Sequence, residues 1–357
     1  MNGPLTETSP PVGGRYKAEK WINAGGMQHV YLAKDKLFDR MVALKTPKDD
    51  TGNKRFANSA EVSAKVNHAN VAKTLDYLLD DNGRAFLVEE LVVGSDLEEI
   101  LKQYLPVLPP STCARILHQL AKGLATSHAA KVVHRDLKPS NIMIVGGWKF
   151  DEVKITDFGI AKLAEEEIGA WAETQGSTQS KTVLGAIPYM SPESILDFKA
   201  GTYPSDVWSI GAIVYRLLSG NPPFGSGLKS IPNILNAVPP VVPVQVQPAQ
   251  FFELGKEICI ILNRCMDKDP TNRPTAPELV LLCDTLCYSI DTYELAIIQR
   301  KGNGGPIGFA SSGQGKDLMC HRDNFYGGGD ISVGKRIWAG RHAGAGSDRA
   351  FPIVTLR

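Results

Sequence analysis

Most of the information in this chain lies in one octapeptide, His134-Arg135-Asp136-Leu137-Lys138-Pro139-Ser140-Asn141. It places a carboxylate base, a cation and an amide oxygen that can bind a metal on one short loop. Asp157-Phe158-Gly159 begins sixteen residues after Asn141, and Val42-Ala43-Leu44-Lys45 lies upstream. A strand lysine, a loop aspartate and a second aspartate, in this order, are the groups that transfer of a phosphoryl group from ATP requires. Because three ordered blocks agree, we expect that chemistry rather than a chance match.

These blocks resemble the eukaryotic-type (Hanks-type) protein kinase family, and the resemblance covers residues 16–286. The stretch Val30-Tyr31-Leu32-Ala33-Lys34-Asp35 is most similar to bacterial serine/threonine members. The resemblance implies an α+β, bilobal fold, with a small β-rich N-lobe that holds one main helix and a larger, mostly helical C-lobe. It also implies ATP and Mg²⁺ as cofactors, with Mn²⁺ as an alternative ion, and Ser or Thr hydroxyls of protein substrates as acceptors.

Local patterns divide the chain into three parts. Residues 1–14 contain Pro and Thr and are expected to form a flexible N-terminus. Residues 15–288 form the predicted kinase domain. Short β-rich runs place the N-lobe at 15–91, and helical patterns place the C-lobe at 92–288.

The third part, residues 289–357, is rich in glycine. Residues 302–346 hold thirteen glycines among forty-five residues and few apolar runs. This composition favours a disordered or loosely packed tail, and a small additional domain is the alternative. No motif in the tail indicates a function.

Charge and hydropathy bear on the partners and location of the protein. The formal net charge is +1, with 39 basic and 38 acidic residues, so nothing indicates a nucleic-acid partner or an anionic membrane surface. No apolar run approaches the roughly 18 residues that a membrane span needs. The N-terminus lacks the basic and apolar regions of a secretion signal. We therefore expect a cytoplasmic protein, and the sequence leaves its oligomeric state open.

Residues 22–30 occupy the place of the glycine-rich loop, whose backbone N–H groups approach the phosphates of ATP. Gly25 and Gly26 are present in it. Asn23 and Gln28 stand where glycines usually do, which predicts a less adaptable phosphate cover.

The rest of the nucleotide site follows from the resemblance. Backbone groups of Glu90 and Val92 are expected to read the adenine. Asp96 is placed to meet the ribose hydroxyls, but a helix N-cap explains this aspartate equally well. The expected ATP contacts are Ile22, Asn23, Gly25, Gly26, Val30, Ala43, Lys45, Glu90, Val92, Asp96 and Met143.

Lys45 is expected to clamp the α- and β-phosphates and to need an acidic partner that holds it in position. Counting back nine residues from His68, as the family pattern suggests, gives Ser59 and not a glutamate. Glu61 lies two residues further on, about 200° around a helix. Glu89 stands on a strand close to Lys45, at a position that is usually apolar. Either Glu89 or Glu61 is therefore the candidate partner.

The predicted catalytic residues are Asp136, Lys138 and Lys45. Asp136 would accept or orient the substrate hydroxyl proton, and Lys138 would neutralise charge on the transferred group. Lys138 favours Ser or Thr as the acceptor. Asn141 and Asp157 are the predicted metal ligands, because Mg²⁺ prefers hard oxygen atoms.

The segment between Gly159 and Glu193 is rich in hydroxyl groups. Thr182 is the predicted site of activating autophosphorylation, with Thr178 second, and Arg135 and Lys162 could bind the phosphate. Ala186 replaces a threonine that normally bridges Asp136 and Lys138. We expect a weaker organisation of the catalytic loop as a result.

Two further residue sets are predicted to hold the fold together. Glu193 is expected to form a buried ion pair with Arg273. Asp206 is expected to bond the backbone of the catalytic loop.

The sequence thus predicts a serine/threonine protein kinase, and two rival interpretations remain. A pseudokinase, which binds nucleotide or a partner without phosphoryl transfer, is suggested by Ser59, Gln28 and Ala186. A small-molecule kinase of similar fold is disfavoured by Ser191-Pro192-Glu193 and the hydroxyl-rich segment, which suit an extended peptide substrate.

Overall fold

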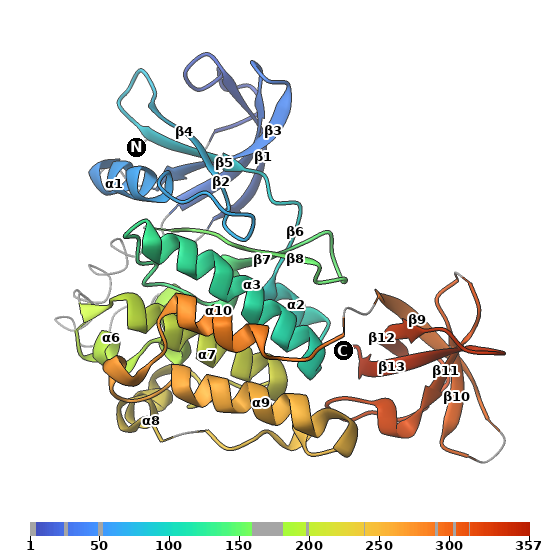
Figure 1. The fold of residues 1–357 in the computed structure, drawn as a ribbon. Coiled ribbons are helices and arrows are strands. Elements are labelled where there is room, and N and C mark those ends of the chain that lie inside the picture. The colour runs from blue at the N-terminus through green and yellow to red at the C-terminus, as the bar shows by residue number, and fades with distance from the viewer. Residues whose placement is uncertain are drawn as a thin grey trace.

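Three bodies follow one another along the chain: a β-rich N-lobe, a helical C-lobe and a small β-barrel (Figure 1). The computed structural model describes residues 5–24, 28–48, 53–158, 181–197, 200–238, 240–289, 292–302, 305–313 and 315–357. The two lobes confirm the predicted bilobal α+β fold. Within the described residues, no helix combines the length and the apolar character that crossing a membrane requires.

An antiparallel sheet with the strand order β1-β2-β3-β5-β4 forms the N-lobe. Because side chains alternate along a strand, the sheet has two distinct faces. Leu44 and Val88 pack with Tyr16 on one face, whereas Leu87 packs against Phe56 of helix α1 on the other. The elements are β1 (Tyr16–Ala24), β2 (Gln28–Asp35), β3 (Arg40–Pro47), α1 (Asn53–Ser63), β4 (Thr74–Leu79) and β5 (Ala85–Glu90).

Helices α3 and α7 lie at the centre of the C-lobe and are buried along most of their length. A capping box between Thr202 and Ser205 starts α7, and Gly220 ends it in the left-handed conformation. The catalytic loop runs between α3 and the small sheet β6-β7-β8. The elements are β6 (Gly94–Asp96), α2 (Leu97–Gln103), α3 (Pro110–Ala129), η2 (Pro139–Asn141), β7 (Ile142–Val145), β8 (Glu152–Ile155), α5 (Lys181–Ala186), η3 (Ile187–Tyr189), α6 (Pro192–Leu196), α7 (Tyr203–Ser219), η5 (Gly227–Ser230), α8 (Ile231–Asn236), η6 (Val244–Val246), α9 (Ala249–Cys265), η7 (Pro270–Asn272) and α10 (Ala276–Asp284).

The glycine-rich C-terminal part folds into a closed β-barrel with the strand order β10-β11-β13-β12-β9. Strands β11 and β13 are parallel, and the other neighbours are antiparallel. The prediction of a disordered or loosely packed tail is therefore wrong for the described residues, and the alternative of a small additional domain is correct. The elements are β9 (Thr292–Lys301), β10 (Ile307–Ser311), β11 (Leu318–His321), η8 (Arg322–Asn324), β12 (Arg336–His342) and β13 (Asp348–Thr355).

The composition led to the wrong prediction of a disordered tail because the strands of a small barrel need only every second residue to be apolar. Ile298, Leu318 and Ile337 point into the barrel together with small residues such as Ala310 and Ala350. No long apolar run results from such strands. The glycines instead lie at turns and at close contacts, so a high glycine content does not indicate disorder here.

The barrel packs on the C-lobe through aromatic residues that belong to the same hydrophobic cluster as the C-lobe core. Trp338 is fully buried, stacks on Tyr293 with 3.9 Å between ring centroids, and donates through Nε1 to the Trp148 carbonyl oxygen at 2.9 Å. Gly327 is left-handed with a φ of 77°, and a Cβ there would lie 2.3 Å from Val107 of the C-lobe. The close approach of the two bodies thus depends on a residue without a side chain.

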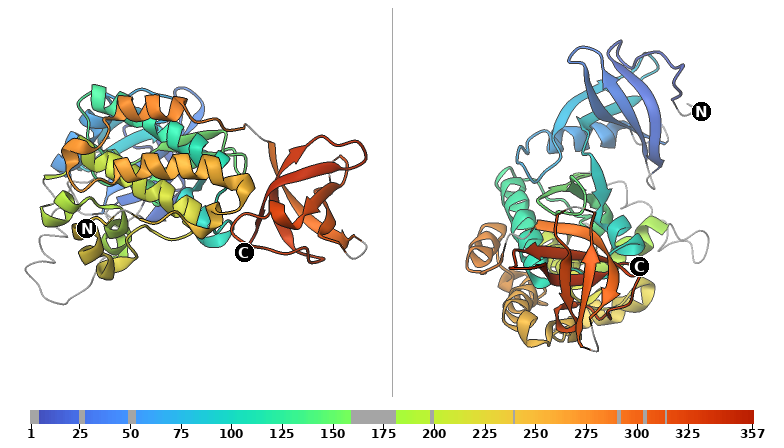
Figure 2. Two further views of the ribbon diagram at one scale, coloured as in Figure 1. Left: turned by 60° about the horizontal axis from the view of Figure 1, so that its bottom comes forward. Right: turned by 90° about the vertical axis from the view of Figure 1, so that its right-hand side faces the viewer.

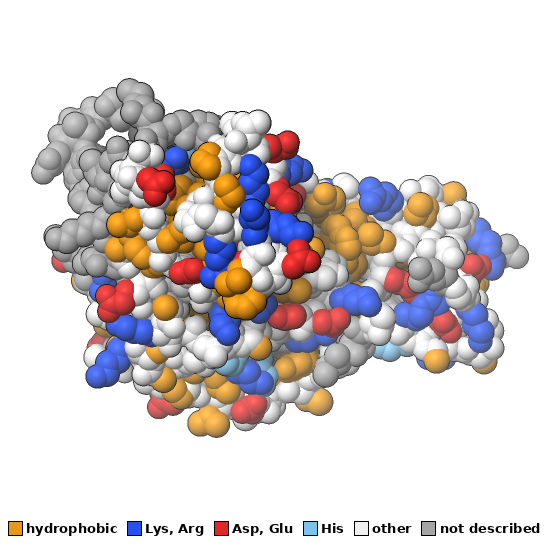
Figure 3. Space-filling view, turned by 90° about the horizontal axis from the view of Figure 1, so that it is seen from above, with side chains coloured by type: hydrophobic (Ala, Val, Ile, Leu, Met, Phe, Trp, Pro, Cys, Tyr) orange, Lys and Arg blue, Asp and Glu red, His pale blue; other side chains and the backbone are white. Residues whose placement is uncertain are grey.

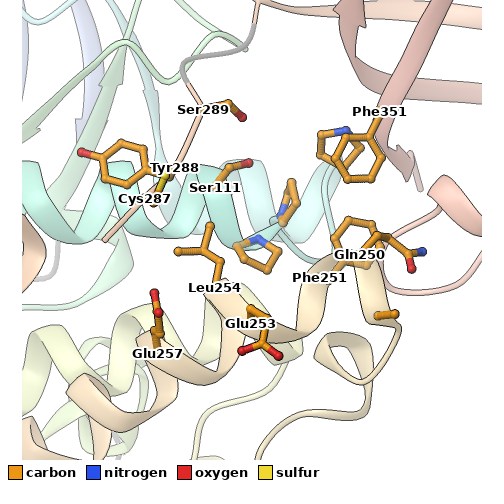
Figure 4. A pocket seen from close by; sticks show the side chains of 14 residues that line it. Ser111, Gln250, Phe251, Glu253, Leu254, Glu257, Cys287, Tyr288, Ser289 and Phe351 are labelled. Carbon is orange, nitrogen blue, oxygen red and sulfur yellow. The ribbon is translucent and has the colours of Figure 1, made fainter. Parts of the chain in front are cut away.

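A pocket of about 350 Å³ opens beside this junction (Figure 4). Phe251 of α9 and Phe351 of β13 stack at one end of it with 5.5 Å between centroids. The other end is formed by the segment that leads into the barrel, including Tyr288 and Ser289. The two views in Figure 2 place the barrel on the side of the C-lobe that carries the ends of α3 and α9.

Candidate active site

Lys45 lies between two carboxylates at the junction of the lobes. Its Nζ is 2.5 Å from Oε2 of Glu89 and 2.7 Å from Oδ1 of Asp157, and its side chain is 7% exposed. The register explains the first contact: Ala43 pairs with Glu89 and Lys45 with Leu87, so Lys45 and Glu89 share one face of adjacent strands. Asp157 reaches the same point from the segment after β8. A strand lysine and the aspartate of the Asp-Phe-Gly block therefore converge.

Burial and charge compete at these three groups. Burial acts to lower the pKa of Lys45, but the Asp157 and Glu89 carboxylates outweigh it and raise that pKa. Burial raises the pKa of Glu89, and the charge of Lys45 only partly opposes this. For Asp157, burial is outweighed by the charge and hydrogen bond of Lys45, so its pKa lies below the ordinary value. The three together hold Lys45 charged and Asp157 ionised.

The second candidate partner of Lys45 lies elsewhere. Glu61 is exposed on α1, and its Oε1 accepts from Lys65 at 3.3 Å, one helical turn away. Glu61 therefore faces away from the site, as its angular position on the helix predicts. The side chain of Ser59 is outside the described residues.

The catalytic loop brings Asp136, Lys138 and Asn141 together. Lys138 Nζ is 2.7 Å from Asp136 Oδ2. Asn141 donates through Nδ2 to the Asp136 carbonyl oxygen at 2.7 Å and to its Oδ2 at 3.2 Å. The amide nitrogen of Asn141 is therefore occupied, which leaves its oxygen as the atom that a metal could bind.

Backbone hydrogen bonds fix this loop against its surroundings. Asp206 accepts from the backbone N–H groups of His134 and Arg135, both at 2.8 Å. The backbone N–H of Thr156 donates to the Asn141 carbonyl oxygen at 2.9 Å, which joins the loop to the segment before Asp157. The predicted role of Asp206 is confirmed.

The predicted ion pair of Glu193 with Arg273 is also present. Arg273 donates through both terminal nitrogens, at 2.7 and 2.9 Å, and its side chain is fully buried. Burial acts against the charge of Glu193, but the hydrogen bonds from Arg273 and Ser205 lower its pKa to about 2. Such a bidentate pair also fixes the orientation of the two groups.

The predicted nucleotide contacts are only partly described. Val30 on β2, Ala43 on β3 and Met143 on β7 lie on the strands that border the junction of the lobes. Ile22 is half exposed near the end of β1. Gly25, Gly26 and the side chain of Asn23 lie outside the described residues.

Two of the acidic candidates have structural partners. Asp96 caps α2 by accepting from the backbone N–H of Glu99 at 2.8 Å. Glu90 accepts from Lys154 Nζ at 2.9 Å. Val92 follows β5 in the connection to β6. The sequence allowed two explanations for Asp96, a ribose contact and a helix N-cap. The observed hydrogen bond is that of the N-cap.

Gln28 is a site residue that the sequence analysis treated only as a missing glycine. It is buried, and its Nε2 donates to Asp157 Oδ1 at 3.1 Å. Its Oε1 is buried without a partner among the described residues. One signal in the sequence could have indicated this residue. Gln28 is two residues from Val30, a predicted ATP contact, so both side chains share one face of β2.

The activation segment is described from residue 181. Thr182 lies in α5, with its side chain outside the described part, and Thr178 and Lys162 fall outside it altogether. Arg135 has a left-handed backbone, with a φ of 64°, and its buried Nε has no partner among the described residues. Ala186 ends α5 and is buried.

A comparison with known families agrees with this geometry. The model of the protein kinase domain matches residues 16–281. The chain belongs to the protein kinase family. The matched region contains both lobes and ends before the barrel begins.

Bacterial kinases are among its relatives. The chain is 33% identical over 276 residues to serine/threonine-protein kinase pkn3 of Myxococcus xanthus, which covers 74% of this chain and 48% of that protein. It is 36% identical over 255 residues to PknA of Mycobacterium tuberculosis (67% and 56%) and 34% identical over 219 residues to PrkC of Bacillus subtilis (60% and 32%). The chain thus spans between a third and a little over half of the length of these relatives.

Proposed function

We propose that this protein is an ATP- and Mg²⁺-dependent kinase that transfers the γ-phosphoryl group to Ser or Thr hydroxyls of proteins. The observation that carries the proposal is the 2.7 Å contact between Lys45 Nζ and Asp157 Oδ1. It joins the phosphate-binding cation of the N-lobe to the metal-binding carboxylate of the C-lobe. The names of the bacterial relatives support a Ser or Thr acceptor.

The residues that would hold the metal suit a hard cation. Asp157 offers an ionised carboxylate and Asn141 offers an amide oxygen. The Oε1 of Gln28, whose side chain contacts Asp157, has no partner within the part of the chain that the structure describes. Held by Asp157 and Asn141, Mg²⁺ would neutralise charge on the phosphates of ATP.

The chain's own groups carry the rest of the reaction. Asp136 would orient the acceptor hydroxyl and take its proton, held in place by the amide of Asn141. Lys138, 2.7 Å from Asp136, would neutralise charge that develops on the transferred group. Lys45 would hold the α- and β-phosphates, and Glu89 would keep Lys45 in position.

Activation is proposed to follow autophosphorylation at Thr182, with Thr178 as the second site. The buried Nε of Arg135, which has no partner among the described residues, supports a phosphate-binding role for this arginine. A guanidinium beside the catalytic aspartate could then couple the phosphate to the loop.

Phosphate incorporation from labelled ATP with Mg²⁺ tests the proposal, with wild type, Asp136→Asn and Lys45→Met compared and the modified sites mapped. Loss of a general base lowers a rate by roughly 10²- to 10⁴-fold, so incorporation should nearly vanish in Asp136→Asn. ATP binding, measured separately, should persist in Asp136→Asn. Equal silence of wild type and both variants, with ATP still bound by wild type, would favour the pseudokinase instead.

A further inference from the structure

The outer face of the barrel carries one continuous row of side chains. Phe309 of β10 pairs with Arg300 of β9 and with Met319 of β11, and Met319 pairs with Arg349 of β13. Their neighbours along the strands, Ala310, Leu318, Cys320 and Ala350, form the barrel core. Because side chains alternate, the row Arg300-Phe309-Met319-Arg349, called the outer row below, points outward.

The outer row is not used to hold the barrel on the C-lobe. Contacts with the C-lobe are made by other barrel residues, among them Tyr293, Tyr326 and Trp338. In Figure 1, β10 and β11 lie on the side of the barrel away from the C-lobe, and the right-hand view of Figure 2 presents the barrel in front of it.

The barrel is basic although the whole chain is nearly neutral. Residues 292–357 carry nine Lys and Arg and five Asp and Glu, which gives a net charge of +4. Because the full chain has a net charge of +1, the other residues have a net charge of −3. Seen from above, the barrel shows Lys and Arg side chains over much of its surface, with Asp and Glu side chains between some of them (Figure 3). The whole chain is nearly neutral because the positive charge of the barrel offsets the negative charge of the other residues. The net charge of the chain therefore did not indicate an anionic partner.

Within the described residues, few acidic side chains neutralise the positive charge of the arginines in the outer row. Arg341, which lies off the row, is bound by Glu294 and Asp348. Among the described residues, the one acidic partner of Arg300 is Asp317 at 3.9 Å, and 60% of the Arg300 side chain is exposed. Arg349 has no ion pair among the described residues.

The centre of the outer row suits a planar ligand. The Arg300 guanidinium lies 3.8 Å from the ring centroid of Phe309, and Met319 adds a polarizable thioether beside it. A guanidinium plane stacked on an aromatic ring can in turn stack a base, and the charges of Arg300 and Arg349 can bind the neighbouring phosphates. Bases can reach such a platform only when they are not paired and stacked in a duplex.

We propose that the outer row binds single-stranded nucleic acid. The strand order supports this choice, because closed five-stranded barrels of the oligonucleotide-binding kind use the face of their second and third strands, here β10 and β11. Fold analogy alone assigns no ligand, so the proposal depends on the residues of the row. Since the barrel shares a core with the C-lobe, a bound strand would be held at a fixed place relative to the active site.

Fluorescence anisotropy of the full chain with labelled dT12 and U12 tests the proposal, with a 12-base-pair duplex and anionic vesicles as competitors. Wild type should bind a single strand more tightly than the duplex, and the two strands separate DNA from RNA as the source. Phe309→Ala should weaken binding by roughly 5- to 150-fold, the effect of losing one stacked base. Phe309→Tyr keeps the ring and should restore it.

Arginine variants separate the outer row from general charge. Arg349→Ala should weaken binding and reduce the slope of log K against log salt by about 0.7. Arg336→Ala removes the same charge from an exposed position of β12 outside the row and should change affinity less than twofold. The binding assay needs no phosphoryl transfer, so its result is independent of the proposed kinase activity.

Four results would overturn the proposal. They are no binding at micromolar protein and low salt, equal effects of Arg349→Ala and Arg336→Ala, binding that Phe309→Ala leaves unchanged, or a preference for the duplex or for vesicles. Unfolding temperatures of the variants within a few degrees of wild type exclude loss of the fold as the cause.

Discussion

At the residue scale, three charged groups, the buried Lys45 and Glu89 and the partly buried Asp157, share one point of the site. Lys45 meets Glu89 from the adjacent strand and Asp157 from the other lobe. In the family pattern, the partner of this lysine comes from a helix whose position controls activity. Here β3 and β5 are hydrogen-bonded neighbours, so the Lys45–Glu89 pair does not depend on where α1 lies. The anchoring of Lys45 is therefore a property of the sheet.

Replacing Glu89 tests this anchoring. Glu89→Gln should lower kcat/KM for ATP by at least roughly 100-fold, close to the effect of Lys45→Met, because breaking a buried ion pair is worth about 3 kcal/mol or more. Glu61→Gln is the matched control and should change kcat/KM less than twofold, since Glu61 is exposed and pairs with Lys65. Steady-state kinetics at several ATP concentrations checks both variants. Equal effects of the two substitutions would assign no special role to Glu89.

What the sequence can predict differs among these residues. Glu89 could be predicted as a candidate because a charged residue in a buried strand needs a partner. The order of the motifs placed its strand close to the strand of Lys45. The spacing of Gln28 to Val30 indicates the face of β2 on which it lies, but its contact with Asp157, 129 positions away, is encoded by no local pattern. The choice between Glu89 and Glu61 needed the register of β3 and β5, which only the folded sheet supplies.

At the element scale, a bidentate ion pair joins α6 to the turn before α10. Arg273 is buried against Glu193, and its guanidinium also lies 4.9 Å from the centroid of the Trp208 ring on α7. One side chain therefore contacts both α6 and α7 from the turn before α10. The barrel shows the opposite case at this scale: its short strands have only alternating apolar residues, so their pattern was too weak to predict the elements.

The Glu193 pKa makes the stability of this junction depend on pH. Its folded value of about 2 lies below the ordinary 4.5, so the pair stabilises the fold fully above about pH 4.5 and loses its effect as pH falls toward 2. Glu193→Gln should lower the free energy of unfolding by about 2 kcal/mol at pH 6, less than for a fully buried pair. The difference from wild type should shrink between pH 5 and pH 3 in urea titrations. Glu257→Gln, on the exposed side of α9, should show no such trend, and a constant difference for Glu193→Gln would contradict the assignment.

At the scale of the whole molecule, the C-lobe and one side of the barrel share a hydrophobic cluster. Tyr293, Tyr326, Trp338 and Val354 of the barrel belong to the cluster that fills the C-lobe. The Tyr326 hydroxyl donates to the Leu218 carbonyl oxygen at 2.9 Å, at the end of α7. An interface of this apolar kind favours a fixed arrangement over independent motion. The barrel is thus a part of the structural unit and not an appendage on a linker.

Trp338 is the residue on which this coupling can be tested. Wild type should unfold in one calorimetric transition, because separating the bodies would expose buried aromatic surface on both. Trp338→Ala should destabilise the protein by about 3–5 kcal/mol and split the transition in two, with the barrel melting first, since it removes the ring that contacts Tyr293 and Phe150. Trp338→Phe should retain a single transition at a lower temperature, and Val333→Ala, at an exposed barrel position, should leave the curve unchanged. Two transitions in wild type, or a single unshifted transition in Trp338→Ala, would mean that the shared core does not couple the bodies.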